Sequence, residues 1–259
     1  MSILDNRIYY INSEKRISGI PSNFTVSLDI PDGSRFDSCC VLSLTIPRSY
    51  YLIRDGQNVV TLVLDGVTNT ITIPPGNYNV NNFITTLLQL LNALSSNTFT
   101  MTYSSVTGKY TYGYTGTASV VSFIFTDPSR IGNQMGFNEV STNTFVAKQL
   151  VSQNVVDFVS TSTLFLHSDC VDDTSAILQE VYSDNSIPFG NLGYNCRFPS
   201  MYTKKLRSSS NAVYNFSLCD EHDLEVDLNG HQVLFTLLLY RKENLTKVLK
   251  TIALSSSSM

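Results

Sequence analysis

The 259-residue sequence is poor in charge and contains no tryptophan. Only 15% of its residues are Asp, Glu, Lys or Arg, against about 25% in an ordinary soluble domain. The 17 Lys and Arg are outnumbered by 21 Asp and Glu, giving a net charge of -4. No basic excess is therefore present to displace counterions from a phosphate backbone, and direct nucleic-acid binding is not expected.

Long apolar runs are also missing. None approaches the roughly 20 residues that cross a bilayer, so no transmembrane segment is predicted. The first seven residues lack a basic stretch followed by an apolar one, so we expect no signal peptide and synthesis in the cytosol. At 42% apolar residues, with 14 Tyr and 14 Phe, the chain is too apolar to be disordered.

Cysteine and histidine patterns do not indicate a metal site. The cysteines are odd in number and form no C-x-x-C pair, which disfavours a disulfide framework and a zinc site; they are Cys39, Cys40, Cys170, Cys196 and Cys219. Reduced thiols are expected. Alternation places Cys40 on the core face of a strand with Leu42, so a buried structural role is favoured over nucleophilic chemistry.

Three polar groups remain as candidate sites. Residues 219–223 (CDEHD) could bind a metal through His222, but a contiguous run cannot aim all its side chains at one point, so a solvated turn is favoured. The basic residues Lys204, Lys205 and Arg207 could contact an acidic neighbour, or could simply aid solubility. Three N-x-[ST] sequons, at Asn23, Asn215 and Asn244, are not expected to be used without a signal peptide.

No catalytic, cofactor-binding or metal-binding residue is assigned, and the chain is not expected to be an enzyme. No G-x-S-x-G elbow supports serine catalysis, and no glycine loop of the phosphate-binding kind is present. Paired carboxylates for glycoside hydrolysis stay open, because their separation is spatial and not sequential. Low charge with abundant Tyr and Phe is instead typical of surfaces that other proteins cover.

Period-two alternation of apolar residues predicts most of the secondary structure as strands. Expected strands cover residues 24–30, 40–46, 59–64, 67–73, 99–103, 110–114, 121–125, 164–167, 214–218, 224–228 and 233–239. Asp65-Gly66 and Asn229-Gly230 predict tight hairpin turns. Residues 183–211 are expected to be rich in loops.

A single helix is predicted over residues 80–94. Its apolar residues follow helical spacing on one stripe: Val80, Phe83, Ile84, Leu87, Leu88, Leu91 and Leu94. Asn79 or Asn81 is expected to cap its start. No βαβ alternation or fixed repeat is visible, so a parallel sheet, a propeller and a solenoid are disfavoured.

The predicted fold class is all-β, a single jelly-roll antiparallel β-sandwich with one inserted α-helix. We expect an N-terminal arm over residues 1–20, a jelly-roll domain over residues 21–241 and a C-terminal tail over residues 242–259. The tail spaces Leu245, Val248, Leu249 and Ile252 as on one helix face. It could dock on a partner or pack on its own domain.

The order of several motifs resembles that of a known capsid family. Residues 11–16 (INSEKR) and 22–26 (SNFTV) resemble the opening of small jelly-roll capsid proteins, and residues 73–78 (IPPGNY) resemble the element before their helix. Residues 134–137 (QMGF) are similar to their L-G-F segment, with Met135 in place of Leu. Residues 216–220 and 227–230 (DLNG) are similar to their closing hairpin. The resembled proteins are penton or minor capsid proteins of virophages, polinton-like viruses and giant double-stranded DNA viruses.

This resemblance implies a structural virion protein. Such a protein closes the fivefold vertices of an icosahedral capsid as a homopentamer, beside a double-jelly-roll major capsid protein. The chain is rather short and no long insertion domain is evident, which leaves open another minor position in the shell. The alternative is a lectin-like or receptor-binding sandwich in which Tyr110, Tyr112 and Tyr114 stack on sugars. Their shared side of one strand suits a core equally well.

Overall fold

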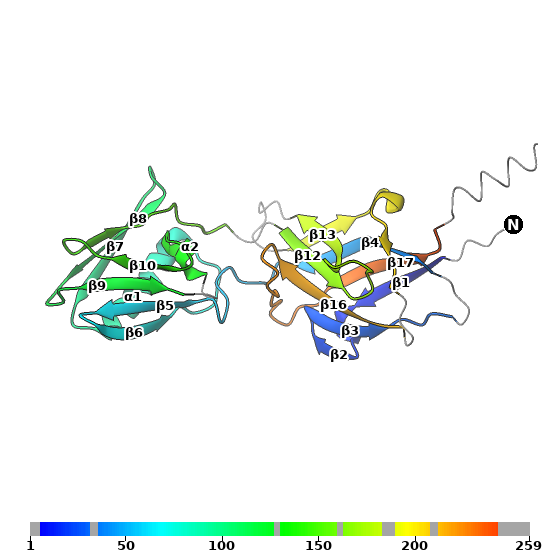
Figure 1. Ribbon diagram of the computed structural model, residues 1–259, viewed down its shortest axis with the longest axis horizontal. Coiled ribbons are helices and arrows are strands. Elements are labelled where there is room, and N and C mark those ends of the chain that lie inside the picture. The colour runs from blue at the N-terminus through cyan, green and yellow to red at the C-terminus, as the bar shows by residue number, and fades with distance from the viewer. Residues whose placement is uncertain are drawn as a thin grey trace, which may run out of the picture. The chain divides into compact units, whose positions relative to one another are not determined.

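The computed structural model describes residues 6–31, 36–126, 130–159, 163–182, 190–207 and 212–242. These residues form seventeen strands in antiparallel sheets and two α-helices (Figure 1). They divide into two compact units. Unit 1 combines Met1–Tyr50 with Thr161–Met259, and unit 2 is Tyr51–Ser160. The predicted all-β class with one substantial helix is confirmed.

Unit 1 has the strand order of a jelly roll. One sheet contains β1, β17, β4 and β14 in that order, and the other contains β13, β12, β16 and β3. When the short β2 and β15 are left out, these are strands 1, 8, 3 and 6 of unit 1 in one sheet and strands 5, 4, 7 and 2 in the other. This interleaving is what two nested Greek keys produce. The short β2 extends the second sheet beyond β3, and β15 pairs with β4.

The bounds of the unit 1 strands match the runs of alternation only in part. They are β1 (Asn6–Asn12), β2 (Ser18–Ile20), β3 (Asn23–Ser27), β4 (Ser38–Pro47), β12 (Thr163–Ser168), β13 (Ile177–Tyr182), β14 (Asn191–Asn195), β15 (Lys204–Lys205), β16 (Val213–Asp220) and β17 (Leu234–Tyr240). Two short 3-10 helices, η1 (Ser13–Lys15) and η2 (Pro199–Met201), lie in connecting segments.

The inward faces of the two sheets form one hydrophobic core. Phe216 of β16 contacts Phe24 of β3 and Phe235 of β17, with ring centroids 5.8 and 5.0 Å apart. All three rings are at most 3% exposed. Burying apolar surface stabilises by about 25 cal/mol per Å². The alternation that places these rings inward is therefore the main determinant of the sandwich.

A β-bulge at Leu42 changes which residues of β4 face this core. Thr236 of β17 pairs with Ser43, while the next residue of β17, Leu237, pairs with Val41, so Leu42 is left without a partner in the register. Such an extra residue shifts the alternation by one. Cys39 and Val41 therefore face the core before the bulge, and Leu44 and Ile46 face it after the bulge. The prediction that Cys40 shares the core face with Leu42 is wrong for this reason.

Unit 2 is inserted between β4 and β12, the third and fourth strands of the jelly roll. Its first sheet orders β10 (Ser141–Thr144), β9 (Val121–Phe125), β5 (Val59–Leu64) and β6 (Val67–Thr72). Its second sheet orders β11 (Gln149–Val151), β8 (Lys109–Thr115) and β7 (Thr98–Ser104). Two helices, α1 (Val80–Leu94) and α2 (Ile131–Met135), complete the unit. Its continuous stretch of chain is visible in Figure 1 as the cyan-to-green elements.

The predicted helix and first hairpin are confirmed in unit 2. Asn79 caps α1 in a capping box with Asn82, in which each side chain accepts a bond from the other residue's backbone N–H. Phe83, Leu87 and Leu91 bury the apolar stripe. Between β5 and β6, Asp65 and Gly66 have φ of 47° and 85°, the left-handed values that a tight hairpin turn requires.

The structure differs from the predicted domain organisation. The region predicted as one jelly-roll domain, residues 21–241, is interrupted by unit 2, an insertion that the sequence did not reveal. The predicted arm, residues 1–20, contains β1, η1 and β2; β1 is paired with β17 along its whole length, so its backbone is part of the sandwich. Residues 1–5 and the predicted C-terminal tail beyond Lys242 lie outside the described residues.

A second difference concerns the segment before β17. Residues 224–228 form no regular strand and make only an isolated bridge between Cys219 and Glu225. Val226 and Leu228 are nevertheless buried in the core of unit 1, which explains their alternation. The turn at Asn229-Gly230 is present, with φ of 49° and 83°. In the loop-rich region, the structure adds β14 and β15, whose sequences do not alternate clearly.

We expect unit 2 to fold as an isolated fragment of residues 51–160. All described members of its hydrophobic cluster lie between Leu52 and Phe158, so the fragment keeps its complete core. Circular dichroism and a dispersed ¹H–¹⁵N NMR spectrum would verify this. Phe123→Ala, at a ring that is 0% exposed, should cost about 3–5 kcal/mol. A wild-type fragment without dispersed resonances would contradict the assignment of an independent unit.

Candidate functional site

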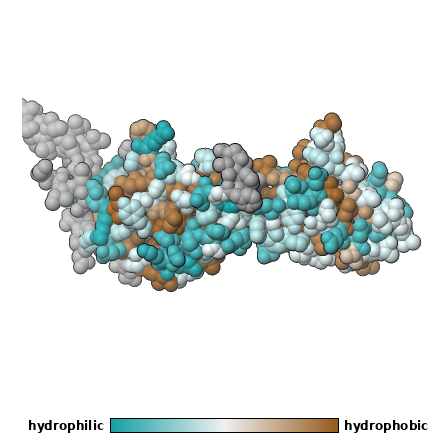
Figure 2. All heavy atoms as spheres, turned by 180° about the vertical axis from the view of Figure 1, so that it is seen from behind, coloured by the Kyte–Doolittle hydropathy of each residue, from teal (hydrophilic) through white to brown (hydrophobic). Residues whose placement is uncertain are grey.

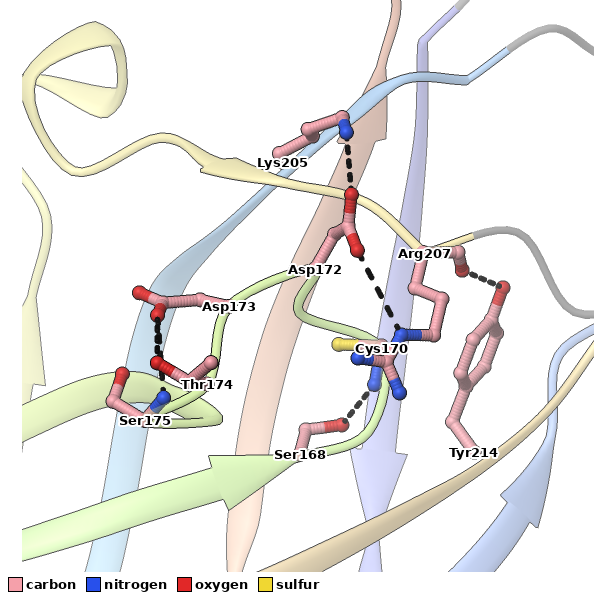
Figure 3. Close-up of polar contacts among 9 residues, drawn as sticks. All are labelled: Ser168, Cys170, Asp172, Asp173, Thr174, Ser175, Lys205, Arg207 and Tyr214. Atoms are coloured by element: carbon pink, nitrogen blue, oxygen red, sulfur yellow. Dashed lines mark hydrogen bonds and ion pairs between the residues drawn. The ribbon is translucent and has the colours of Figure 1, made fainter.

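Two of the three basic residues singled out in the sequence, Lys205 and Arg207, form an ion-pair cluster within unit 1. Lys205 of β15 donates to the carboxylate of Asp172, and Arg207 Nε lies 3.9 Å from Asp172 Oδ1 (Figure 3). The side chains of Lys205 and Arg207 are 75% and 56% exposed. Within the chain, both residues pair with Asp172.

Backbone hydrogen bonds hold this cluster in place. Asp172 donates its N–H to the carbonyl of Lys205 at 2.9 Å, and Arg207 donates its N–H to the carbonyl of Cys170 at 2.7 Å. The hydroxyl of Tyr214 donates to the carbonyl of Arg207 at 3.3 Å, as Figure 3 shows. The turn between β12 and β13 is thereby fastened to the segment that follows β15.

The two aspartates of this turn have lowered pKa values. For Asp172 the cause is first the hydrogen bond from Lys205 and then the positive charge of the same ammonium group, with a smaller effect of Arg207. For Asp173 it is the hydrogen bonds from the backbone and side chain of Ser175. Contacts within the chain stabilise the charged form of both carboxylates, as expected of side chains in a structural turn.

Residues 219–223 form a turn and not a converging ligand set. The carboxylate of Asp220 accepts from the backbone N–H groups of His222 and Leu224 at 2.9 and 3.1 Å. Asp223 points instead toward His167 of β12, with 3.5 Å between Oδ1 and Nε2. Within the described ranges, no group of three or more His, Cys, Asp or Glu is placed to hold a metal ion.

The vicinal cysteines point to opposite sides of β4. Cys39 and Cys40 are both 0% exposed. The thiol of Cys39 hydrogen-bonds to that of Cys170, and this bond together with burial raises the pKa of Cys39. Cys40 lies on the other side, beside Cys196. Thiols held in the neutral form are poor nucleophiles, so the predicted structural role fits both residues.

The tyrosines on which a lectin-like interpretation depended belong to the core of unit 2. Tyr110, Tyr112 and Tyr114 are 0%, 1% and 5% exposed. Their hydroxyls donate to the carbonyls of Val80, Met135 and Ala118. Burial raises the pKa values of Tyr110 and Tyr112. These rings therefore offer no exposed face on which a sugar could stack.

Two of the three sequons lie side by side in unit 1. Asn215 donates from its amide to Oδ1 of Asn23 at 3.1 Å, and Asn23 donates to the carboxylate of Glu225 at 2.9 Å. Both amides are thus engaged in hydrogen bonds between β16, β3 and the segment after β16. The third sequon, at Asn244, lies outside the described residues.

Exposed apolar side chains are the strongest candidate for an interaction surface. On the outward face of the first jelly-roll sheet, Ile8 and Tyr10 of β1 are 47% and 84% exposed, and Leu234 of β17 is 47% exposed. We call these three residues the β1 patch. Figure 2 shows, on the face turned to the viewer, apolar side chains interspersed with polar ones over both units. The patch was not predicted from the sequence, because residues 1–20 were expected to form an arm.

Similarity to known proteins is found among solved structures and not among sequences. No family model matches the sequence, and no curated protein matches it. Among solved structures, the chain is similar to the crystal structure of the mavirus penton protein, with 10% sequence identity and a TM-score of 0.44. The match covers 90% of this chain and 99% of that chain.

The helices of the structure are α1, α2 and the short 3-10 helices η1 and η2. Of those in the part of the chain that the structure describes, none combines the length and the apolar character needed to cross a membrane.

The pKa of Asp172 provides a test of the ion-pair cluster. Lys205→Ala should raise this pKa toward the usual carboxyl value of about 3.9, because it removes both the hydrogen bond and the charge. Since the folded-state pKa is lowered, the pair stabilises the fold above the usual carboxyl pKa, and this contribution is lost as pH falls through the lowered value. NMR titration of the side-chain carboxyl carbon measures the shift.

Lys204→Ala is the matched control for this titration. Lys204 is the neighbouring residue of β15, and its charge acts on Asp173 and not on Asp172. The control should therefore leave the titration of Asp172 unchanged. Equal shifts in both variants would show that the general basic charge of the strand, and not the contact with Lys205, sets this pKa.

Proposed function

We propose that the protein is a structural subunit of an icosahedral double-stranded DNA virus capsid. In this role it is a penton that closes the fivefold vertices as a homopentamer beside a double-jelly-roll major capsid protein. The observation that carries the proposal is the jelly-roll strand order of unit 1, in a chain whose motifs follow the order of penton and minor capsid proteins. The protein is then located in the virion and acts without catalysis.

The motifs behind the resemblance have structural roles in this fold, which supports the proposal. In residues 73–78, Asn77 accepts the backbone N–H of Leu52 at 2.8 Å, and the hydroxyl of Tyr78 donates to the carbonyl of Pro74 at 2.8 Å. The segment thus fixes the chain that leads into α1. Residues 227–230 form the turn that precedes β17. Both motifs position secondary structure, as expected of a shared fold.

A pentamer requires contacts that differ on the two sides of each subunit. Such heterologous contacts close into a ring when successive rotations add to a full turn. Obligate assemblies bury on the order of 2,000 Å² or more per interface, and their contact surfaces are depleted in charge and enriched in aromatic residues. The low charge of the chain and the exposed β1 patch fit these requirements. We therefore place one side of the lateral contact at the β1 patch.

Size-exclusion chromatography with light scattering tests the proposed assembly. The full chain should elute with five times the mass of the 28.8 kDa subunit, alone or after mixing with the major capsid protein. A double variant, Ile8→Asn with Tyr10→Asn, should shift the protein toward monomer. Both side chains are substantially exposed in the single chain, so folding should be retained and can be verified by circular dichroism.

Val106→Asn is the matched control. Val106 is 93% exposed in the turn between β7 and β8 of unit 2, so the substitution removes a similar exposed apolar side chain far along the sequence from β1. This variant should remain pentameric. A wild-type chain that stays monomeric at high concentration, both with and without the major capsid protein, would contradict the penton proposal. A pentameric double variant would contradict the placement of the contact.

A further inference from the structure

We propose that Cys40 and Cys196 form a disulfide when the folded protein meets a disulfide oxidant such as glutathione disulfide. Their sulfur atoms lie 4.0 Å apart in unit 1, on the side of β4 that faces away from the sandwich core. This inference concerns covalent chemistry within one chain and is independent of the proposed capsid role.

The bulge at Leu42 creates the pairing. Without the extra residue, alternation would place Cys40 on the same face as Leu44 and Ile46, inside the sandwich. With the bulge, Cys40 points outward, where it is covered and 0% exposed. Cys196 follows β14 directly and donates its backbone N–H to the carbonyl of Leu42 at 2.8 Å. That hydrogen bond holds the two cysteines on neighbouring segments of the same sheet.

The remaining distance can be closed at the end of β14. A disulfide requires about 2.05 Å between sulfur atoms, so the thiols must approach by roughly 2 Å. Cys196 lies just beyond the last residue of β14, at the start of the connecting segment 196–203. This segment belongs to neither β14 nor β15, so it lies outside the regular strand pairing of the sheet. A side-chain rotation together with a small shift of its backbone brings the sulfur atoms together.

Exposure assigns different roles to the two thiols. Cys196 is partly exposed, whereas Cys40 is buried. Burial and the neighbouring sulfur raise the pKa of Cys40 to about 12, which makes it a poor initial nucleophile. Cys196 therefore attacks the oxidant first. The thiol of Cys196 first loses its proton to water. The resulting thiolate attacks glutathione disulfide, forms a mixed disulfide and releases one glutathione as a thiolate.

Cys40 then completes the reaction. After losing its proton, its sulfur attacks Cys196 Sγ of the mixed disulfide and displaces the second glutathione as a thiolate. In total, two protein thiols lose two electrons and two protons, and one glutathione disulfide is reduced to two glutathione molecules. The product closes a covalent loop across the 156 positions that separate the two cysteines. It attaches segment 196–203, which carries the exposed residues Phe198 and Met201, to β4.

The other cysteines provide internal comparisons. Cys39 and Cys170 also lie in contact, but both are 0% exposed and face the core, so an oxidant cannot reach them in the folded protein. Cys219 is partly exposed, and its thiol has no second cysteine beside it. It can form a mixed disulfide with glutathione and cannot resolve it. Selective linkage of Cys40 to Cys196 therefore distinguishes this geometry from general thiol oxidation.

Peptide mapping after native oxidation tests the proposal. The full chain is incubated with glutathione disulfide, free thiols are blocked with N-ethylmaleimide in acid, and the protein is digested without reduction. Trypsin alone leaves Cys170 and Cys196 on one peptide, so a second cleavage after Glu180 is needed. The expected product links residues 36–48 to residues 181–197, and fragmentation between Cys39 and Cys40 in the mass spectrometer assigns the bond to Cys40. A link to residues 149–180, or no link at all, would overturn the proposal.

Two variants and a melting curve complete the test. Cys196→Ser should abolish the link, whereas Cys219→Ser should leave it unchanged. Oxidised wild-type protein should melt about 5 °C or more above reduced protein, because cross-linking distant residues restricts the unfolded chain. The Cys196→Ser protein should show no such gain on oxidation. A link that persists in Cys196→Ser, or a wild-type link without any rise in melting temperature, would contradict a native disulfide at this site.

Discussion

Pairing of the first and last strands of unit 1 is the constraint on which the sandwich depends. Seven residues of β1 face seven residues of β17, so Asn6 lies opposite Tyr240 and Asn12 opposite Leu234. On its other side β17 pairs with β4, which makes it a central strand. Phe235, Leu237 and Leu239 of this strand are buried between the sheets. The pairing thus brings together segments separated by more than 200 residues, and core burial offsets the entropy of closing that loop.

The bulge in β4 shows how one unpaired residue determines local chemistry. It lets Cys39 meet Cys170 inside the sandwich while the adjacent Cys40 meets Cys196 outside it. Neither contact follows from the spacing of cysteines in the sequence. The same region carries the ion pair between Lys205 and Asp172, which fastens another segment beside β4. One strand therefore organises both thiol pairs and the polar cluster.

Elements whose structure depends on residues close together in the chain were the easiest to predict from the sequence. The helix from Val80 to Leu94 was predictable because its apolar stripe and its capping asparagine lie within one short segment. The Asp65-Gly66 turn was predictable because it needs only a glycine that adopts a positive φ. The insertion of unit 2 was not predictable, because its strands alternate in the same way as those of unit 1. The division depends on which strands pair, and pairing between distant segments leaves little trace in any one of them.

The candidate surfaces were less predictable than the fold for a related reason. Ile8 and Tyr10 were assigned to an arm that reaches neighbouring capsid proteins. In the sequence, Ile8, Tyr9, Tyr10 and Ile11 form a continuous apolar run without alternation. In the structure, Tyr9 and Ile11 face the core while Ile8 and Tyr10 face outward. An apolar residue on each face removes the period-two pattern. The absence of alternation here reflects a strand with apolar side chains on both sides.

The position of β17 near the end of the described chain also imposes an order on biosynthesis. Unit 2 is a continuous stretch, so all of its strands are available once residue 160 has left the ribosome. The jelly roll, in contrast, lacks a central strand until β17 has emerged, and until then β1 and β4 keep unpaired edges. Nascent chains therefore carry a complete unit 2 and an incomplete jelly-roll sheet while the last third of the protein is translated. Until β17 arrives, those unpaired edges are surfaces at which the nascent chain can pair with strands of other chains.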